Sequence, residues 1–164
     1  MLNMLSKVDK DEEIDKDEKN THTLQSHTSI YEKYSGKVER LKEGFAEVHL
    51  EIVEDMLADK IGLIHNGYIF SSASFAAAIS VNEKYGFVIG SMVHFLTPVR
   101  EHDIVVFKAK SRHKIGRKRV VDVVGRVHEI RVFIGEFTVT VMDRHVLNVK
   151  LDEIEIPEKD DEAL

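Results

Sequence analysis

One uncharged stretch, from Gly67 to Asn82, constrains the fold of this chain more than any other feature. It contains no Asp, Glu, Lys or Arg, although 32% of all residues are of these types. Its length and its richness in Ala and Ser predict a buried helix and not a strand, and it is too short to span a membrane. We expect the helix to end in the charged segment before Gly86, with this glycine as its C-terminal cap. Small residues recur along it at helical spacing, so other elements can pack closely around it: Ser72, Ala73, Ala76, Ala77 and Ser80.

The segments that follow this stretch are dense in Val, Ile, Phe and Thr. The turns between them are too short for crossover helices, so we expect antiparallel pairing. Upstream, residues 37–53 predict a hairpin, because apolar and polar residues alternate there around a Lys-Glu-Gly turn. The sequence therefore predicts an α+β fold, a curved antiparallel sheet wrapped around one long central helix. The remaining expected strands are residues 87–96, 104–114, 118–128 and 132–142.

The two ends of the chain differ from its centre. Residues 1–35 begin with alternating acidic residues and lysines and are expected to form a disordered tail, and residues 147–164 are expected to form a second acidic tail. Residues 36–146 are then the single folded domain, for which 164 residues suffice. The chain has no cysteine. His22 and His27 are close in sequence but lie in a polar context, so no metal site is expected.

Charge and the N-terminal sequence bound the setting in which the protein works. A net charge of −6 argues against general nucleic-acid binding. The N-terminus does not combine a basic region with an apolar core, as a secretory signal would. We therefore expect a cytoplasmic protein with neither a nucleic-acid nor a membrane partner.

Two motifs flank the expected helix and the strand after it. Ile64-His65-Asn66-Gly67 leads into the helix, and Val93-His94-Phe95-Leu96-Thr97-Pro98-Val99-Arg100 closes the strand. In this order they resemble the hotdog-fold thioesterase superfamily, over about residues 36–146. Phe70-Ser71-Ser72-Ala73-Ser74 and the segment from Gly116 to Val123 also resemble the effector-binding domain of the bacterial repressor of fatty-acid and phospholipid biosynthesis, which binds malonyl thioesters without cleaving them. The stretch before Gly36 is too short and too polar for that repressor's DNA-binding domain.

The resemblance implies an oxyanion site at the start of the helix. In related thioesterases, the glycine after the motif histidine donates its backbone N–H to the thioester oxygen. Here that position is Asn66, with Gly67 next. The first N–H groups of a helix have no intrahelical partner, and the helix dipole favours negative charge there. Simple turn geometry explains Gly67 equally well.

The resemblance also shows what this chain lacks. Thioesterases of the phenylacetate type carry a carboxylate on the helix nine residues after the motif histidine, where this chain has Ser74. A serine without a base is a weak nucleophile near neutral pH, and a helical serine often only bonds back to its own helix. His65 is a substitute base or a structural histidine. Four further candidates are more simply explained by surface or packing roles: Asp55, Asp59, Glu83 and His94.

Basic residues gather on one expected hairpin of this acidic protein, beginning at Lys110. Arg and Lys bind phosphate well, and coenzyme A carries several phosphate charges. The alternative is an ordinary solvated strand edge, where lysine discourages edge pairing. The predicted cofactor-binding residues are Arg112, Lys114, Arg117, Lys118 and Arg119.

These observations lead to two hypotheses from different functional classes. The first is a hydrolase of fatty-acid metabolism that cleaves acyl-coenzyme A or acyl carrier protein thioesters with His65, Asn66, Gly67 and Ser74. The second is a non-catalytic protein that binds or senses such thioesters, which the missing carboxylate favours. In both, coenzyme A or the pantetheine of the carrier protein enters as part of the ligand, and no tightly bound cofactor is expected. Hotdog folds pair edge to edge, so we expect a homodimer or higher oligomer formed through the apolar strand 87–96. A purely structural dimer, a third possibility, leaves the His-Asn-Gly loop without a purpose.

Overall fold

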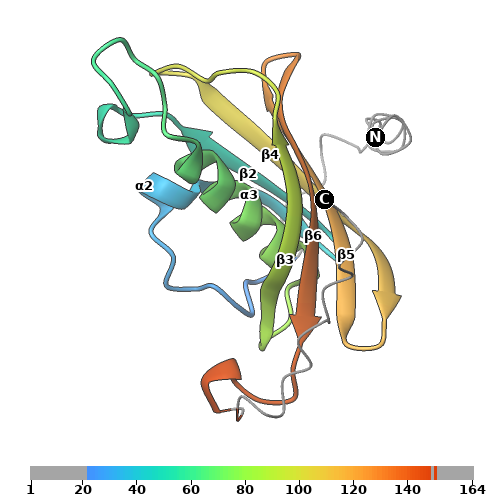
Figure 1. The fold of residues 1–164 in the computed structure, drawn as a ribbon. Coiled ribbons are helices and arrows are strands. Elements are labelled where there is room, and N and C mark those ends of the chain that lie inside the picture. The colour runs from blue at the N-terminus through green and yellow to red at the C-terminus, as the bar shows by residue number, and fades with distance from the viewer. Residues whose placement is uncertain (1–21, 149, 151–164) are drawn as a thin grey trace, which may run out of the picture.

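The computed structural model describes residues 22–148 and 150. Two short helical turns, Glu54–Met56 and Val146–Asn148, accompany the regular elements. In chain order these elements are α2 (Glu32–Ser35), β1 (Lys37–Lys42), β2 (Phe45–Glu51), α3 (Asn66–Val81), β3 (Gly86–Phe95), β4 (Ile104–Ile115), β5 (Lys118–Val127) and β6 (Ile130–Val141) (Figure 1).

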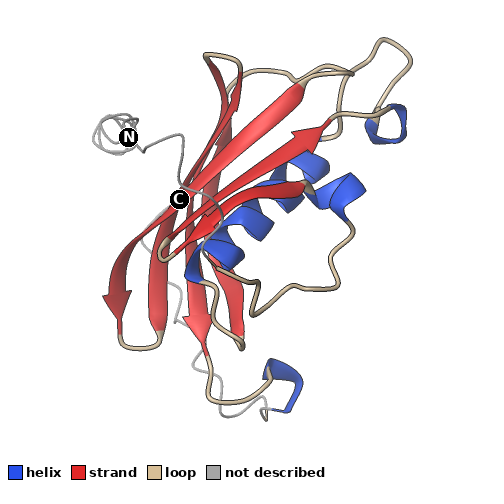
Figure 2. Cartoon of the chain, turned by 180° about the vertical axis from the view of Figure 1, so that it is seen from behind, coloured by secondary structure: helices blue, strands red, loops and turns tan. Residues whose placement is uncertain are grey.

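The six strands form one antiparallel sheet in the order β1-β2-β4-β5-β6-β3. The sheet is curved, and α3 lies along its concave side (Figures 1 and 2). This arrangement confirms the predicted hotdog fold, with one long helix wrapped by an antiparallel sheet. Because β3 is placed beside β6 and not beside the hairpin, it forms one free edge of the sheet, and β1 forms the other.

The core lies between α3 and the concave face of the sheet. Alternation along the strands supplies it, since successive side chains of a strand point to opposite faces. On β2, Val48 and Leu50 are fully buried, and Val48 pairs with the equally buried Phe107 of β4. Phe133 and Phe137 of β6 complete the centre of this core. Transfer of such side chains out of water stabilises a fold by about 1.5–3 kcal/mol each, which makes this layer the main source of stability.

The end of α3 differs from the prediction. The helix ends at Val81 and not near Gly86, and Asn82 is its cap, with φ 49° and ψ 38°. Asparagine tolerates this left-handed conformation better than other side chains that carry a Cβ, and its N–H bonds to the carbonyl of Ala78. Gly86 instead opens β3. The expectation of a glycine cap was therefore wrong.

Residues 22–35 pack against the domain. Leu24, Ile30 and Tyr34 are partly buried against the core, and α2 lies over α3. The packed part of the chain therefore reaches back to residue 22, ahead of the predicted domain boundary at residue 36. The rest of the predicted N-terminal tail, and nearly all of the predicted C-terminal tail, lie outside the described residues.

Within the described ranges, none of the helices combines the length and the apolar character that crossing a membrane requires.

Candidate functional site at the start of helix α3

The loop before α3 holds the start of the helix in a fixed position. The N–H of His65 donates to the carbonyl of Met56 at 3.0 Å, and Leu57 bridges to Ile64. His65 is the N-cap, with extended φ and ψ, and its side chain makes no capping hydrogen bond. Residues 65–67 are exposed. The backbone N–H groups of Asn66 and Gly67 therefore lie in an exposed turn with no partner inside the helix, whereas the N–H of Tyr68 donates to the carbonyl of His65 at 3.1 Å.

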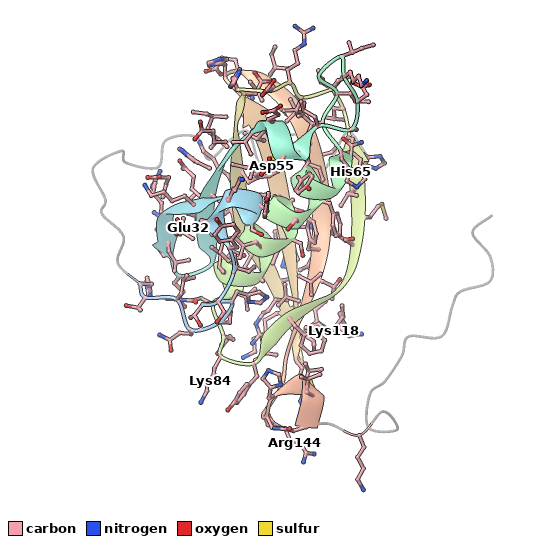
Figure 3. The ribbon with its side chains drawn as sticks, turned by 90° about the vertical axis from the view of Figure 1, so that its left-hand side faces the viewer. Glu32, Asp55, His65, Lys84, Lys118 and Arg144 are labelled. Carbon is pink, nitrogen blue, oxygen red and sulfur yellow. The ribbon has the colours of Figure 1, made fainter. Side chains whose placement is uncertain are left out.

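Gly67 and the imidazole of His65 lie against each other. A Cβ on Gly67 would fall 2.6 Å from Nε2 of His65, which is closer than real side chains approach. Only glycine therefore leaves the imidazole in this place. The ring of Tyr68 meets the His65 ring edge-on, at 6.1 Å and 90°. The predicted oxyanion residues and the predicted substitute base are thus neighbours at one end of the domain, where Figure 3 shows His65 and Asp55.

Asp55 is engaged by α2 and is not poised as a base. Its carboxylate forms an ion pair with Lys33 and accepts a hydrogen bond from the Tyr34 hydroxyl at 3.2 Å. The hydrogen bond from Lys33 lowers the pKa of Asp55, with the charge of Lys33 adding to the effect. The Tyr68 hydroxyl donates to the backbone carbonyl of Asp55 at 3.4 Å. Asp55 therefore joins α2 to the start of α3.

The other three candidate bases have structural explanations. Asp59 accepts hydrogen bonds from the backbone N–H groups of residues 61, 62 and 63, at 2.8, 3.0 and 3.1 Å, and these bonds lower its pKa. Glu83 is exposed beyond the far end of α3. His94 follows Val93, which packs against the core, so His94 points to the convex face of the sheet.

One side of α3 stays open along its first half. Ser74 is half-buried, and Phe70, with 36% of its surface exposed, marks the middle of this open face. Gly67 and Ser74 are seven residues apart, so they share one side of the helix but lie about 10 Å apart along its axis. Ser74 and Gly67 of the same chain therefore do not meet at one thioester carbonyl. Ser71 faces α2, where its hydroxyl lies 3.2 Å from that of Ser35.

The predicted basic cluster lies at the other end of the domain. Figure 3 shows Lys118 far from His65. Arg112 is paired on the convex face with Asp122, at 2.6 Å between Nε and Oδ2, and also with Glu136. Arg117 pairs with Asp143 at 2.6 Å, and Arg119 donates to the backbone carbonyls of residues 116 and 118. Among the described side chains, no ion pair is recorded for Lys114 or Lys118.

A hollow that the sequence did not reveal lies near the far end of α3. It has a volume of about 220 Å³, and Lys84, Tyr85 and Phe87 line it together with Ser26, His27 and His145. These residues come from three separate segments, so no spacing in the sequence connects them. The adjacent cation and aromatic ring of Lys84-Tyr85 are the one local signal. No group of three or more His, Asp or Glu side chains placed to hold a metal ion occurs among residues 22–148.

No protein-family model matches the sequence. Among solved structures, protein PH1136 of Pyrococcus horikoshii is 35% identical, with a TM-score of 0.76 over 77% of this chain and 98% of that one. Cj0977, a sigma28-regulated virulence protein of Campylobacter jejuni, is 30% identical, with a TM-score of 0.73 over 76% and 88%. PaaI, from the phenylacetic acid degradation operon of Escherichia coli, is 22% identical, with a TM-score of 0.62 over 66% and 80%.

This chain belongs to the same family of hotdog-fold proteins as PH1136 and Cj0977. Two more distant hotdog structures were solved with a coenzyme. A hypothetical thioesterase of Streptococcus pneumoniae, 23% identical with a TM-score of 0.59 over 66% and 87% of the two chains, contains coenzyme A. Smu.793 of Streptococcus mutans, 20% identical with a TM-score of 0.64 over 72% and 97%, is bound to acetyl CoA.

Two curated proteins share part of this hotdog chain. Methylthioribose-1-phosphate isomerase of Aquifex aeolicus is 40% identical over 121 residues, which are 73% of this chain and 26% of that protein. Transcription factor FapR of Thermoanaerobacter is 31% identical over 107 residues, which are 65% of this chain and 53% of FapR. The chain thus spans about a quarter of the first relative and about half of the second.

Proposed function

We propose that this hotdog protein binds an acyl thioester of coenzyme A at the start of α3, in a groove closed by a second copy of the chain. The single observation that carries the proposal is the exposed first turn of α3, where the imidazole of His65 lies against Gly67. Unpartnered N–H groups and the helix dipole favour a partly negative thioester oxygen there. The coenzyme-bound hotdog structures support this class of ligand.

A second copy fits the free edge of the sheet at β3. None of the ten residues of β3 is Asp, Glu, Lys or Arg, so the strand lacks the charges that usually keep edges apart. Four of its five exposed residues lie in its middle, from Ile89 to Met92, and the fifth is Phe95 at its end. An antiparallel pairing of two β3 strands centred between Gly90 and Ser91 buries these four residues in both copies. The dimer is then a closed two-fold assembly with a continuous sheet.

This two-fold axis determines which residues meet across the dimer. Ser91 pairs with Phe137, whose ring lies 5.9 Å from that of Phe70. Along the direction of the strands, Phe70 therefore lies at about the same position as the axis. Gly67 lies three residues before it and Ser74 four residues after it, so the axis places Gly67 of one copy opposite Ser74 of the other. A thioester held at Gly67 then lies beside the second copy's Ser74.

The chemistry at this position favours binding over rapid hydrolysis. Hydrolysis requires a base that takes a proton from water while the water oxygen attacks the carbonyl carbon and the thiolate leaves. Ser74 stands where thioesterases of the phenylacetate type carry a carboxylate, and α3 contains no acidic residue. Loss of such a base typically costs about 10²–10⁴-fold in rate.

Hydrolysis is the second candidate function, and the position of His65 favours it. Its imidazole is exposed and adjacent to Gly67, and histidine is the side chain that most often serves as a general base. In this case His65 accepts the proton of the attacking water, and the departing coenzyme A thiolate takes up a proton.

Two measurements on the same protein test the proposal. Calorimetric titration with acetyl-, malonyl- and longer acyl-coenzyme A measures binding, and a free-thiol release assay measures hydrolysis. We expect binding with little thiol release. Turnover that disappears in His65→Ala while ligand affinity is retained establishes the hydrolase instead. Absence of binding by every thioester in the panel contradicts both functions.

A designed carboxylate tests the role assigned to position 74. Ser74→Asp restores the acid that the family places there, so we expect thiol release to rise by about 10²-fold or more. Ser71→Asp is the matched control, because Ser71 faces α2 and not the groove. Equal rates in the two variants contradict the placement of Ser74 beside the thioester.

A further inference from the structure

The hollow near the far end of α3 has the features of a nucleotide pocket. Lys84 and Tyr85 belong to the loop between α3 and β3, and His145 follows β6. Figure 3 shows Lys84 and the neighbouring Arg144 at the end of the domain opposite His65. None of the roles described for the start of α3 uses these residues.

The side chains that line this pocket combine a cation with aromatic surface. The Nζ of Lys84 lies 5.0 Å from the centre of the Tyr85 ring. The His145 ring meets Tyr85 edge-on, at 6.5 Å and 82°. A base stacks well on such rings, and a lysine ammonium binds phosphate. This pairing of an aromatic platform with a cation suits a ligand that carries both a base and phosphates.

Hydrogen bonds determine which groups face the ligand. The N–H of Leu147 donates to Nδ1 of His145 at 3.2 Å, so the neutral imidazole carries its proton on Nε2 and donates from there. Nδ1 of His27 lies 3.0 Å from the Ser26 hydroxyl. Burial lowers the pKa of His27, which keeps this ring neutral near pH 7. The two histidines therefore offer directed hydrogen bonds to a ligand.

The backbone holds the walls of the pocket in register. The N–H of Met142 donates to the carbonyl of Tyr85 at 3.2 Å, which ties the loop to the end of β6. On the other wall, the side chain of Asn82 bonds Gln25 and Thr23 and so holds the segment that carries His27. A pocket preorganised in this way loses little entropy when it binds a ligand.

We propose that this pocket binds the adenine nucleotide of the same coenzyme A whose thioester lies at Gly67 of the other copy. This rests on the proposed function and its two-fold axis. Gly86 lies about 15 Å from the axis along β3, and Gly67 about 5 Å from it along α3. The axis therefore brings the pocket of one copy to the same end of the dimer as Gly67 of the other copy. Measured along the strands, the pocket lies about 10 Å further from the axis than Gly67 does. The phosphopantetheine arm of coenzyme A spans such a gap.

The basic hairpin is the competing location for the nucleotide. Its arginines are already paired with carboxylates or backbone carbonyls, which leaves Lys114 and Lys118 as its candidates. Matched lysine substitutions separate the two locations, because Lys84 and Lys118 are both exposed and each loses one charge on conversion to Gln.

The test uses calorimetry on the full chain with coenzyme A and with adenosine 3′,5′-bisphosphate, which lacks the pantetheine arm. We expect Lys84→Gln and His145→Gln each to weaken both ligands severalfold, Tyr85→Ala to weaken them tenfold or more, and Lys118→Gln to leave them unchanged. Lys84 and His145 are exposed, so their variants keep the test valid if Tyr85→Ala unfolds. Loss of affinity in Lys118→Gln but not in Lys84→Gln overturns the assignment. ATP binding tighter than coenzyme A also overturns it, because the pocket then serves a free nucleotide.

A nucleotide-free thioester separates this inference from the proposed function. Acetyl-N-acetylcysteamine carries the thioester and the end of the arm alone, and its binding is followed by the amide signal of Gly67. We expect it to bind the wild type and Tyr85→Ala equally well. If it fails to move the Gly67 signal while the bisphosphate still binds, the proposed function fails and the pocket stands. If it binds while Lys84→Gln, His145→Gln and Tyr85→Ala leave coenzyme A affinity unchanged, the pocket assignment fails alone.

Discussion

Asn82 Oδ1 accepts a hydrogen bond from the backbone N–H of Gln25 at 2.9 Å, which joins the end of α3 to the N-terminal segment. Its Nδ2 donates to the carbonyl of Thr23 at 3.0 Å. One asparagine therefore ends the helix in a left-handed conformation and also holds residues 23–25 against it.

Substitutions at Asn82 separate these two roles. Asn82→Gly keeps the left-handed backbone but removes both side-chain bonds, so we expect a loss of roughly 1–2 kcal/mol in the free energy of unfolding. Asn82→Ala also strains the backbone and should lose about 1 kcal/mol more. Urea unfolding measures both values. Hydrogen exchange at residues 24–30 should quicken in each variant, and unchanged exchange there would contradict the clamping role.

Gly67→Ala tests the contact with His65. Gly67 lies in the first turn of a helix, where alanine is favoured by up to about 1 kcal/mol, so the melting temperature should hold or rise. The new methyl group displaces the imidazole, because it falls 2.6 Å from Nε2. We expect affinity for acetyl-coenzyme A to fall by tenfold or more in calorimetry. Full affinity in a stably folded variant would remove the ligand from this turn.

Asp122 makes stability depend on pH. It is 4% exposed, and burial raises its pKa, opposed by the charge of Arg112 and reinforced by that of Glu136. A carboxyl group with a raised pKa in the folded state destabilises the fold once pH exceeds its ordinary value, and this penalty grows until pH passes the raised pKa.

Asp122→Asn removes this penalty. The variant should therefore match or slightly trail the wild type near pH 3.5 and gain on it towards pH 7, by about 1 kcal/mol or less. Thermal unfolding across this range measures the difference. Glu136→Gln serves as the control for loss of a neighbouring charge on the same face. A stability difference that stays constant with pH would contradict a raised pKa for Asp122.

The edge of β3 is expected to form the dimer interface. Ser91→Glu places two like charges close together beside the proposed axis, which opposes pairing of the strands. Sedimentation equilibrium should give twice the chain mass for the wild type and the single chain mass for the variant. His113→Glu, on exposed β4 away from this edge, should remain a dimer. A dimeric Ser91→Glu protein would require a different interface.

The sequence was sufficient to predict most of the fold, because its period and composition report directly on burial. The uncharged run that ends near Asn82 needed cover on most sides, which a sheet provides. The turns between the strands were too short for crossover helices, so only antiparallel pairing was possible. The helix cap was missed because Gly86 is the stronger signal in the sequence. Asn82 is instead selected by its side-chain hydrogen bonds to Gln25 and Thr23, which lie 57 and 59 positions earlier in the chain.

The candidate site was predicted less completely, because its parts depend on register and on distant segments. Asp122 and Glu136 face Arg112 only because β4, β5 and β6 pair as they do. The spacing of Gly67 and Ser74 already implied a separation of about two helical turns, but the meaning of that separation depends on a second copy. The proposed nucleotide pocket joins three segments that no local pattern connects.

The most direct test of a thioester site at the start of α3 is a titration of the ¹⁵N-labelled protein with acetyl-coenzyme A, followed by the backbone amide signals. If the thioester oxygen lies at the helix start, the largest shifts occur at Asn66 and Gly67, and adenosine 3′,5′-bisphosphate alone leaves these two signals in place. If acetyl-coenzyme A binds and shifts other amides while those of Asn66 and Gly67 do not move, the ligand lies elsewhere and the proposed function is contradicted.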